Sequence, residues 1–341
     1  MNTTNKQEKN RKPALYIFIS ARPRNMIDKH KIIAWGLLAE SLFKHPSPQH
    51  LYIEPTNDCG LHCSICPNKA DRRKTGYLNF NLFKKIIREI PFSANLENIT
   101  LHKNGEPLLH PKLSQMIGYI KKHLPDVKIS FSTSGVPLNK KLSLKILQSP
   151  SDEIYVSLGN ILVDPKKDKR QIKIIDTARQ NIKDFLALRN KLKKNGPKLT
   201  LRFIYKGNKN FTLLNPQKTK WAGLADKIEI RPYHNWCGYF KRPYAVPKNR
   251  TPCLNLWTTL AINWNGSVSI CSLDYAGVGT LGSLKKESLK DIWKGENLRL
   301  YRKRHLDNDY KNLQPCKNCT EWRHNVGFWT PENLKKARCH L

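Results

Sequence analysis

A length of 341 residues with 39% hydrophobic residues is enough for one large globular domain and a smaller second one. No apolar run approaches the length of a membrane span, and the polar, basic start leads into no signal-peptide core. We therefore expect a soluble, cytoplasmic protein with no membrane span. The formal net charge of +35 suits anionic partners, but the basic residues are spread along the whole chain, so nucleic acid is a less favoured partner.

Residues 1–47 are predicted to be a basic N-terminal extension. Met1–Pro13 is polar and lacks apolar periodicity, which is typical of a disordered segment. A helix is expected around Asp28–Phe43. The sequence does not indicate what this extension does.

Residues 48–236 alternate apolar strands with amphipathic helices. Strands are expected at Leu51–Glu54, Asn98–His102, Val127–Ser132, Glu153–Leu158, Lys198–Tyr205 and Lys227–Arg231. Helices are expected between them at Asn81–Ile90, Pro111–His123, Lys140–Leu147, Ile172–Lys194 and Pro216–Leu224. This alternation predicts an α/β domain of six parallel βα units, a partial TIM-like (β/α)6 barrel, with its chemistry at the carboxyl ends of the strands.

Residues 237–341 follow a different pattern and are predicted to form a smaller α+β domain. The apolar segments Thr259–Trp264 and Ser267–Cys271 flank Asn265 and Gly266, which is a strong β-hairpin signal. A short helix is expected at Leu289–Trp293, followed by a polar stretch.

Nine cysteines in a cytosolic chain are expected to be mostly free thiols, and their spacing suits metal ligands. Cys59, Cys63 and Cys66 follow the first predicted strand as C-x3-C-x2-C. Three thiolates on one loop can hold three irons of a cubane and leave the fourth open, whereas iron–sulfur clusters normally take four cysteines. The alternative is a zinc site completed by a residue such as His62.

The next three predicted strands end in small and polar residues. The second is followed by Lys103–Pro107 (KNGEP), the third ends in Ser132–Gly135 (STSG) and the fourth in Ser157–Asn160 (SLGN). Glycine permits close approach of the backbone to a ligand, and the oxygen atoms of Glu, Ser and Thr can accept hydrogen bonds from a positively charged ligand group such as an ammonium.

Together these segments resemble the radical S-adenosylmethionine (radical SAM) superfamily. The resemblance implies that Cys59, Cys63 and Cys66 hold a [4Fe–4S] cluster whose open iron chelates S-adenosylmethionine, which is cleaved to a 5′-deoxyadenosyl radical. The cofactor-binding residues that it implies are Gly105, Glu106 and Pro107 of a GGEP-like motif, Ser132, Ser157 and, as a carboxylate partner, Arg202. Two positions depart from the family pattern: Asn104 replaces the first glycine of the motif, and Ile65 stands where an aromatic residue is common.

A second cysteine set, Cys253, Cys271, Cys316 and Cys319, resembles the SPASM/Twitch domain attached to many radical SAM enzymes. The resemblance implies the shorter, single-cluster Twitch version, with an auxiliary [4Fe–4S] cluster held by these four cysteines. A zinc ribbon is the alternative, because four cysteines also suit zinc. Cys237 is predicted to be a buried, inert thiol, although a role toward substrate stays open, and Cys339 is predicted to be incidental.

The resemblance further implies hydrogen abstraction from an unactivated C–H bond, with the auxiliary cluster as electron acceptor. Dehydrogenation of a small alcohol or sugar-like molecule is the favoured reaction. The alternatives are modification of a peptide or of RNA, and a basic zinc protein that binds nucleic acid without catalysis. Substrate contacts are expected from Arg231, Tyr233, His234 and Asp274, with Arg231 or His234 as the catalytic proton acceptor. A flavodoxin- or ferredoxin-like protein is the expected electron donor.

Overall fold

The computed structural model describes residues 17–19, 37–40, 42–43, 47–61, 63–71, 73–90, 95–158, 169–192, 196–205, 225–241, 246–339 and 341. Within these residues no helix combines the length and the apolar character needed to cross a membrane. The helix predicted at Pro216–Leu224 and the segment Met1–Pro13 lie outside them. Of the helix predicted at Asp28–Phe43, residues 37–40 and 42–43 are described, and they are helical.

Ten strands in the described part of the chain form one open sheet. They are β1 (Ile17–Ile19), β2 (His50–Ile53), β3 (Asn98–Thr100), β4 (Lys128–Thr133), β5 (Glu153–Ser157), β6 (Lys198–Tyr205), β7 (Lys227–Pro232), β8 (Thr259–Ile262), β9 (Ser267–Ser269) and β10 (Thr280–Ser283). Their order is β1-β7-β6-β5-β4-β3-β2-β8-β9-β10, and all neighbours from β1 to β8 are parallel. The six predicted parallel strands are present as β2 to β7. The two end strands, β1 and β10, do not pair with each other, so the sheet of the described residues does not close into a full barrel. The predicted partial barrel is confirmed.

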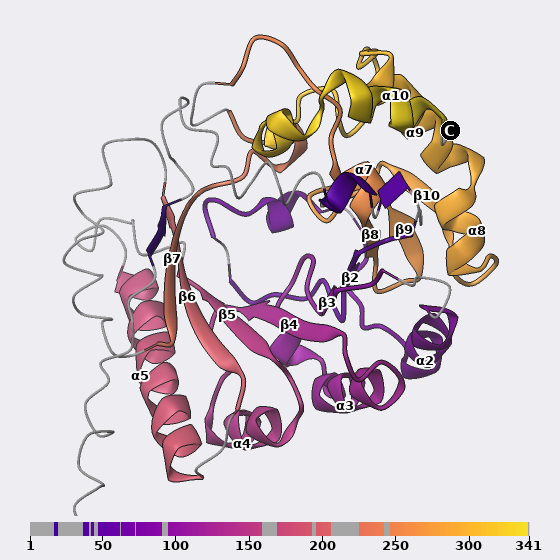
Figure 1. Cartoon of the computed structure of the whole chain (residues 1–341). Helices are drawn as coiled ribbons and strands as arrows, with labels where there is room; N and C mark the ends of the chain where they lie inside the picture. Colours follow the sequence, from indigo (N-terminus) through magenta and orange to yellow (C-terminus); the bar gives the residue numbers. More distant parts are fainter. Residues whose placement is uncertain are drawn as a thin grey trace, which may run out of the picture.

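Four helices connect consecutive parallel strands and cover the outer face of the sheet (Figure 1). They are α2 (Phe80–Glu89), α3 (Leu113–His123), α4 (Lys140–Gln148) and α5 (Lys169–Lys191). Two of them begin at an asparagine cap, which satisfies amides that have no partner within the helix. Asn79 Oδ1 accepts from the amides of Asn81 and Leu82, and Asn139 Oδ1 accepts from the amide of Leu142.

The C-terminal part of the chain continues the same sheet. β8 pairs in parallel with β2, so that Leu260 lies opposite Leu51, and β8 and β9 form the predicted antiparallel hairpin. The helices of this part are α7 (Asn255–Thr258), α8 (Leu289–Lys294), α9 (Glu296–Leu306) and α10 (Pro331–Cys339), drawn in orange and yellow in Figure 1. Because β2 carries the first cysteine loop at its carboxyl end, this pairing brings the two predicted cysteine sets into one region.

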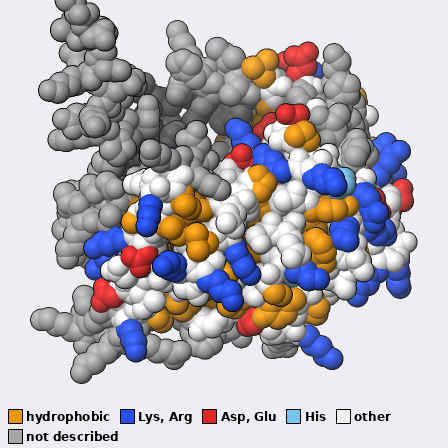
Figure 2. Space-filling view, turned by 90° about the horizontal axis from the view of Figure 1, so that it is seen from below, with side chains coloured by type: hydrophobic (Ala, Val, Ile, Leu, Met, Phe, Trp, Pro, Cys, Tyr) orange, Lys and Arg blue, Asp and Glu red, His pale blue; other side chains and the backbone are white. Residues whose placement is uncertain are grey.

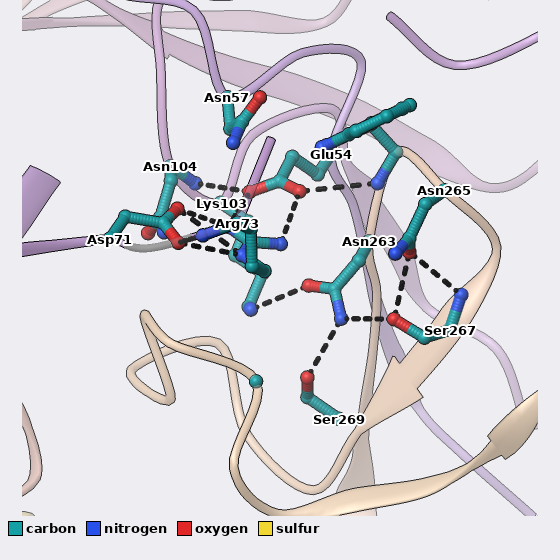
Figure 3. A network of polar contacts seen from close by, with 12 residues as sticks. Glu54, Asn57, Asp71, Arg73, Lys103, Asn104, Asn263, Asn265, Ser267 and Ser269 are labelled. Carbon is teal, nitrogen blue, oxygen red and sulfur yellow. Dashed lines mark hydrogen bonds and ion pairs between the residues drawn. The ribbon is translucent and has the colours of Figure 1, made fainter. Parts of the chain in front are cut away.

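A buried carboxylate, that of Glu54, lies at the carboxyl end of β2 and is fully excluded from solvent. Its two oxygens accept from both terminal guanidinium nitrogens of Arg73, at 2.9 and 3.0 Å. They also accept from the amide of Asn104, at 3.2 Å, and from the amide of Trp264, at 3.1 Å (Figure 3). The Glu54 carboxylate is therefore hydrogen-bonded to three segments: the one after the cysteine loop, the KNGEP segment and the C-terminal hairpin.

A buried cation, that of Lys103, extends this network into the C-terminal part (Figure 3). The ammonium of Lys103, which is 2% exposed, donates to Asn263 Oδ1 at 2.6 Å and to the backbone oxygen of Asp274 at 2.8 Å. The amide of Asn263 donates in turn to the hydroxyls of Ser267 and Ser269, both at 2.9 Å. Burial lowers the pKa of Lys103 from its ordinary value, although Glu54 acts against this shift.

We predict that Glu54→Gln lowers the free energy of unfolding by about 3 kcal/mol, because it removes the charge of a fully buried carboxylate and leaves Arg73, which is 13% exposed, with only Asp71 as an ionic partner in the described structure. Urea titration of the anaerobically purified protein, followed by far-UV circular dichroism, would measure this change. The matched control is Glu296→Gln, which removes a carboxylate that is 81% exposed and paired with Arg299, and should cost less than about 1 kcal/mol. Equal effects of the two substitutions would contradict the central role of Glu54.

Candidate active site and auxiliary metal centre

A cavity of about 180 Å³ lies at the carboxyl ends of β3, β4 and β5, beside the loop that follows β2. Its polar lining includes Cys59, Cys63, Cys66, Gly105, Glu106, Ser132, Thr133, Ser134, Ser157 and His234. Its apolar lining includes Leu61, Ile65, Leu158, Ile174, Ile175, Ala178 and Ile204. The cysteine triplet, Gly105, Glu106, Ser132 and Ser157, predicted from separate segments, thus line one cavity.

Gly105 is required by the close approach of two loops. Its φ is +75°, and a Cβ at this position would lie 2.4 Å from the backbone oxygen of Thr56 and 2.8 Å from the backbone of Asn57. The next amide, that of Glu106, donates to the backbone oxygen of Asp58 at 2.7 Å. The KNGEP segment is therefore packed directly against the chain that leads into Cys59, which a side chain at residue 105 would prevent.

Glu106 is buried between two strand ends. One of its oxygens accepts from the amide and the hydroxyl of Ser134, both at 2.8 Å, and the other accepts from the amide of Leu108. Burial raises the pKa of Glu106, against the effect of these hydrogen bonds. This fixed carboxylate is a suitable acceptor for a bound ammonium group. Pro107 is the first residue of the short 3-10 helix Pro107–Leu109, and it is buried.

The three cysteines after β2 line the same cavity. Burial raises the pKa of Cys59 to about 11 and that of Cys66 to about 12. Thiols in such surroundings stay protonated in the absence of a metal, and a bound metal ion displaces the protons.

His102 is a residue of this cavity that the sequence analysis missed. It lies directly before the KNGEP segment, and its Nδ1 is buried without a hydrogen-bond partner in the described structure. Burial lowers its pKa to about 4, so the ring is neutral at physiological pH. Its position at the end of a predicted strand was the only signal available.

His234 is held by a second residue that the sequence analysis missed, Glu321. His234 Nδ1 lies 2.9 Å from a carboxylate oxygen of Glu321, which is 8% exposed. The same oxygen lies 3.3 Å from His324 Nε2, but His324 is not among the residues that line the cavity. A buried carboxylate beside one ring nitrogen fixes the orientation of an imidazole and leaves the other nitrogen for a ligand.

Of the other four predicted residues, Tyr233 lines this cavity, and Arg202, Arg231 and Asp274 are not among its described lining residues. Arg202 and Arg231 both pair with Glu229, at 3.0 and 3.1 Å, and neither is among the described residues that line the cavity. Asp274 is 1% exposed, and its carboxylate accepts from the amides of residues 278 and 279. Tyr233 does line the cavity, and its hydroxyl donates to the backbone oxygen of residue 241.

A second, smaller cavity contains the other cysteine set. Its lining includes Cys253, Cys271, Cys316 and Cys319, as predicted, together with Cys237, Arg250 and His305. All nine cysteines of the chain are free. Cys253 is held through its amide, which donates to His305 Nδ1 at 3.1 Å, whereas the buried His305 Nε2 has no partner in the described structure.

One short segment separates the two cavities. Trp236 lines the first cavity and Cys237 lines the second. Trp236 Nε1 donates to the backbone oxygen of Ile65, between the second and third cysteines of the triplet, at 3.0 Å. Asn235 donates to the backbone oxygen of Asn318, next to Cys319, at 2.9 Å. The segment after β7 is therefore bonded to both cysteine sets.

The donor sets fit two iron–sulfur clusters. Three thiols on one loop, facing a cavity with a fixed carboxylate, match a cubane with one open iron, and the second cavity offers at least the four thiols of a fully ligated one. Among the described residues, no three Cys, His, Asp or Glu side chains converge closely enough to hold a single metal ion. His62, named above as a zinc ligand, lies outside them.

Comparison with known proteins agrees with this arrangement. The profile of the Radical SAM superfamily matches residues 53–208, and that of the SPASM iron–sulfur cluster-binding domain matches residues 253–320. The tungsten-containing aldehyde ferredoxin oxidoreductase cofactor-modifying protein of Pyrococcus furiosus is 24% identical over 298 residues, which cover 74% of this chain and 83% of that protein. The S-adenosyl-L-methionine-dependent 2-deoxy-scyllo-inosamine dehydrogenase of Niallia circulans is 22% identical over 281 residues, which cover 82% and 94% of the two chains.

The fold is also found in a solved structure. BtrN, crystallised in complex with AdoMet and 2-DOIA, superposes with a TM-score of 0.55 at 17% identity, over 80% of this chain and 93% of that one. The two matched domains imply a catalytic and an auxiliary [4Fe–4S] cluster, with S-adenosylmethionine as a further cofactor. This chain belongs to the radical SAM superfamily and is an iron–sulfur enzyme with a SPASM-type auxiliary domain.

Proposed function

We propose that this enzyme dehydrogenates an alcohol group of a small, sugar- or cyclitol-like molecule. The observation that carries the proposal is the buried carboxylate of Glu321 beside His234, in the wall of the cavity that the cysteine triplet also lines. Conversion of a carbinol to a ketone removes a hydrogen atom from carbon, a proton from oxygen and one electron. An imidazole oriented by a carboxylate is a suitable acceptor for that proton.

When bound, the cluster of Cys59, Cys63 and Cys66 with S-adenosylmethionine supplies a 5′-deoxyadenosyl radical for hydrogen abstraction, and the auxiliary cluster supplies an electron acceptor. Glu106, fixed by Ser134, is proposed to hold the amino group of the methionine moiety. The hydroxyls of Ser132 and Ser157 line the same cavity and are proposed to contact the remaining polar groups of the cofactor.

His234 is proposed to accept the proton at Nε2. A carboxylate beside Nδ1 is placed to accept a hydrogen bond from Nδ1–H, and this orientation directs Nε2 toward the proton of the substrate. The side chain of His234 is 39% exposed, which leaves room for a substrate hydroxyl beside it. Arg231, the other proton acceptor named from the sequence, is paired with Glu229 and is the weaker candidate.

The two relatives support small-molecule chemistry to different degrees. The Niallia circulans relative is named as a dehydrogenase of 2-deoxy-scyllo-inosamine, and the match covers nearly all of that protein. The Pyrococcus furiosus relative is named as a cofactor-modifying protein, which favours modification of a cofactor as a second candidate function. A flavodoxin- or ferredoxin-like protein is proposed as the electron donor for either reaction.

RNA has less support as a substrate. Over the middle of the face seen in Figure 2 the Lys and Arg side chains lie among apolar and uncharged groups, and at its right-hand edge they lie beside Asp and Glu. A protein that binds RNA through its phosphates commonly gathers basic side chains into one patch or stripe.

We predict that only polyols accelerate the release of 5′-deoxyadenosine. Anaerobic, reconstituted and reduced enzyme would be offered a panel of aminocyclitols and sugars, a peptide mixture, or total transfer RNA in separate reactions. The expected product is the polyol less two hydrogens, formed in the same amount as 5′-deoxyadenosine and detected by mass spectrometry. Acceleration by peptides or by RNA alone would refute small-molecule dehydrogenation in favour of those substrates.

We also predict that His234→Gln slows formation of the oxidised product about 100-fold, the contribution typical of a general base. Release of 5′-deoxyadenosine should change much less, because the cysteine triplet and Glu106 are untouched, so the ratio of product to 5′-deoxyadenosine should fall. His324→Gln is the matched control, since this residue contacts the same Glu321 oxygen from outside the cavity lining. Equal losses in both variants would assign the effect to packing around Glu321 and contradict the role of His234.

A further inference from the structure

The auxiliary cavity contains one thiol more than a cubane requires. A [4Fe–4S] cluster takes about four cysteine ligands, whereas Cys237 lines this cavity together with Cys253, Cys271, Cys316 and Cys319. Cys237 precedes the matched SPASM segment, which begins at residue 253. It therefore lies outside the segment that matches the cluster-binding domain, unlike the other four cysteines of this cavity.

Cys237 is held in place by its neighbours along the chain. Its backbone has a φ of +57°, a conformation that non-glycine residues rarely adopt, and the preceding Trp236 has a φ of +48°. The side chain of Asn235 fixes this turn from the other side: its nitrogen donates to the oxygen of Asn318, and its oxygen accepts from the amide of Thr320. The turn is thus bonded to both residues that flank Cys319.

Cys237 lines the same small cavity as Cys271 and Cys319, where its thiol interacts with both of theirs. It therefore lies between one ligand from the hairpin and one from the C-x2-C pair. A second observation marks the same cavity as a ligand site: the buried His305 Nε2 has no hydrogen-bond partner in the described structure, although His305 lines the cavity and its Nδ1 is bonded.

We infer that Cys237 is a fifth thiol ligand of the auxiliary iron–sulfur site and can replace Cys271 or Cys319 on iron. In this exchange the iron–sulfur bond to Cys271 or Cys319 breaks and one to Cys237 forms. The proton of the Cys237 thiol passes to the departing thiolate, which lines the same cavity, so no electron is gained or lost. The exchange moves ligation to the residue whose neighbour, Trp236, lines the S-adenosylmethionine cavity.

The inference depends on the cluster and not on the substrate, so it is tested by iron content. The starting protein is the full-length Cys59→Ala/Cys63→Ala/Cys66→Ala variant, which should retain only the auxiliary cluster, about four irons per chain after anaerobic reconstitution. Adding Cys271→Ala should leave about four irons, with an altered electron paramagnetic resonance spectrum of the reduced cluster, because Cys237 takes the vacant place. Adding Cys237→Ala to that variant should remove the cluster.

Cys319→Ala, alone and with Cys237→Ala, repeats the test from the second contact and serves if Cys271→Ala does not fold, as judged by circular dichroism. Cys339→Ala is the control, since this thiol is exposed and lines neither cavity. Loss of iron in the Cys271→Ala and Cys319→Ala variants while Cys237 is still present would overturn the inference. Retention of about four irons after Cys237 is also removed would overturn it equally, because another group would then be the replacement.

Discussion

The carboxylate of Glu54 is the interaction on which the arrangement of this enzyme depends. It lies fully buried at the end of β2, where it accepts hydrogen bonds from three separate segments of the chain. A buried carboxylate is costly unless each lone pair is satisfied, so the segments that satisfy it are fixed relative to one another. Two of those segments flank the cysteine triplet and Glu106, and the third is the hairpin that leads to Cys271. One charge thus connects the segments that carry the two candidate ligand sets.

The wall between the two cavities is the second feature that joins the two sites. Trp236 and Cys237 are consecutive, yet one lines the larger cavity, beside the cysteine triplet, and the other lines the smaller cavity with the C-terminal cysteines. Both residues have a positive φ, a backbone conformation that residues other than glycine rarely adopt. Any substrate held beside His234 is therefore separated from the auxiliary site by a single short segment.

The sequence predicts the core of the fold well, because β2 to β7 and the helices between them follow clear apolar periods. It does not predict α9, since Arg302 and His305 lie buried beside Leu298 at positions where an apolar residue would be expected. The strand β1 was also missed, because three residues are too few to show a pattern.

The candidate site also contains some residues that the sequence predicts and others that it does not. The cysteines, Gly105 and Glu106 could be found because their spacing is a local property of the chain. Glu321 could not be found, and the place of Cys237 beside the other cysteines could not be predicted, because their partners are distant in sequence. Glu321 lies beside His234, and Cys237 shares a cavity with Cys271, only after the C-terminal part has folded onto the core.

The departure from the GGEP motif at Asn104 has a physical reason in this network. A glycine at this position could still donate its backbone N–H to the Glu54 carboxylate. It would have no side chain to form hydrogen bonds with Asp71 and with the backbone of Tyr275. The side-chain nitrogen of Asn104, Nδ2, donates to the Asp71 carboxylate at 3.2 Å and to the backbone oxygen of Tyr275 at 2.8 Å. Lys103, the residue before it, donates to Asn263 and to the backbone of Asp274. The segment that contacts the cysteine loop is thereby also bonded to the auxiliary domain, which explains why a larger, polar residue is favoured here: it stabilises the interface between the two cluster sites.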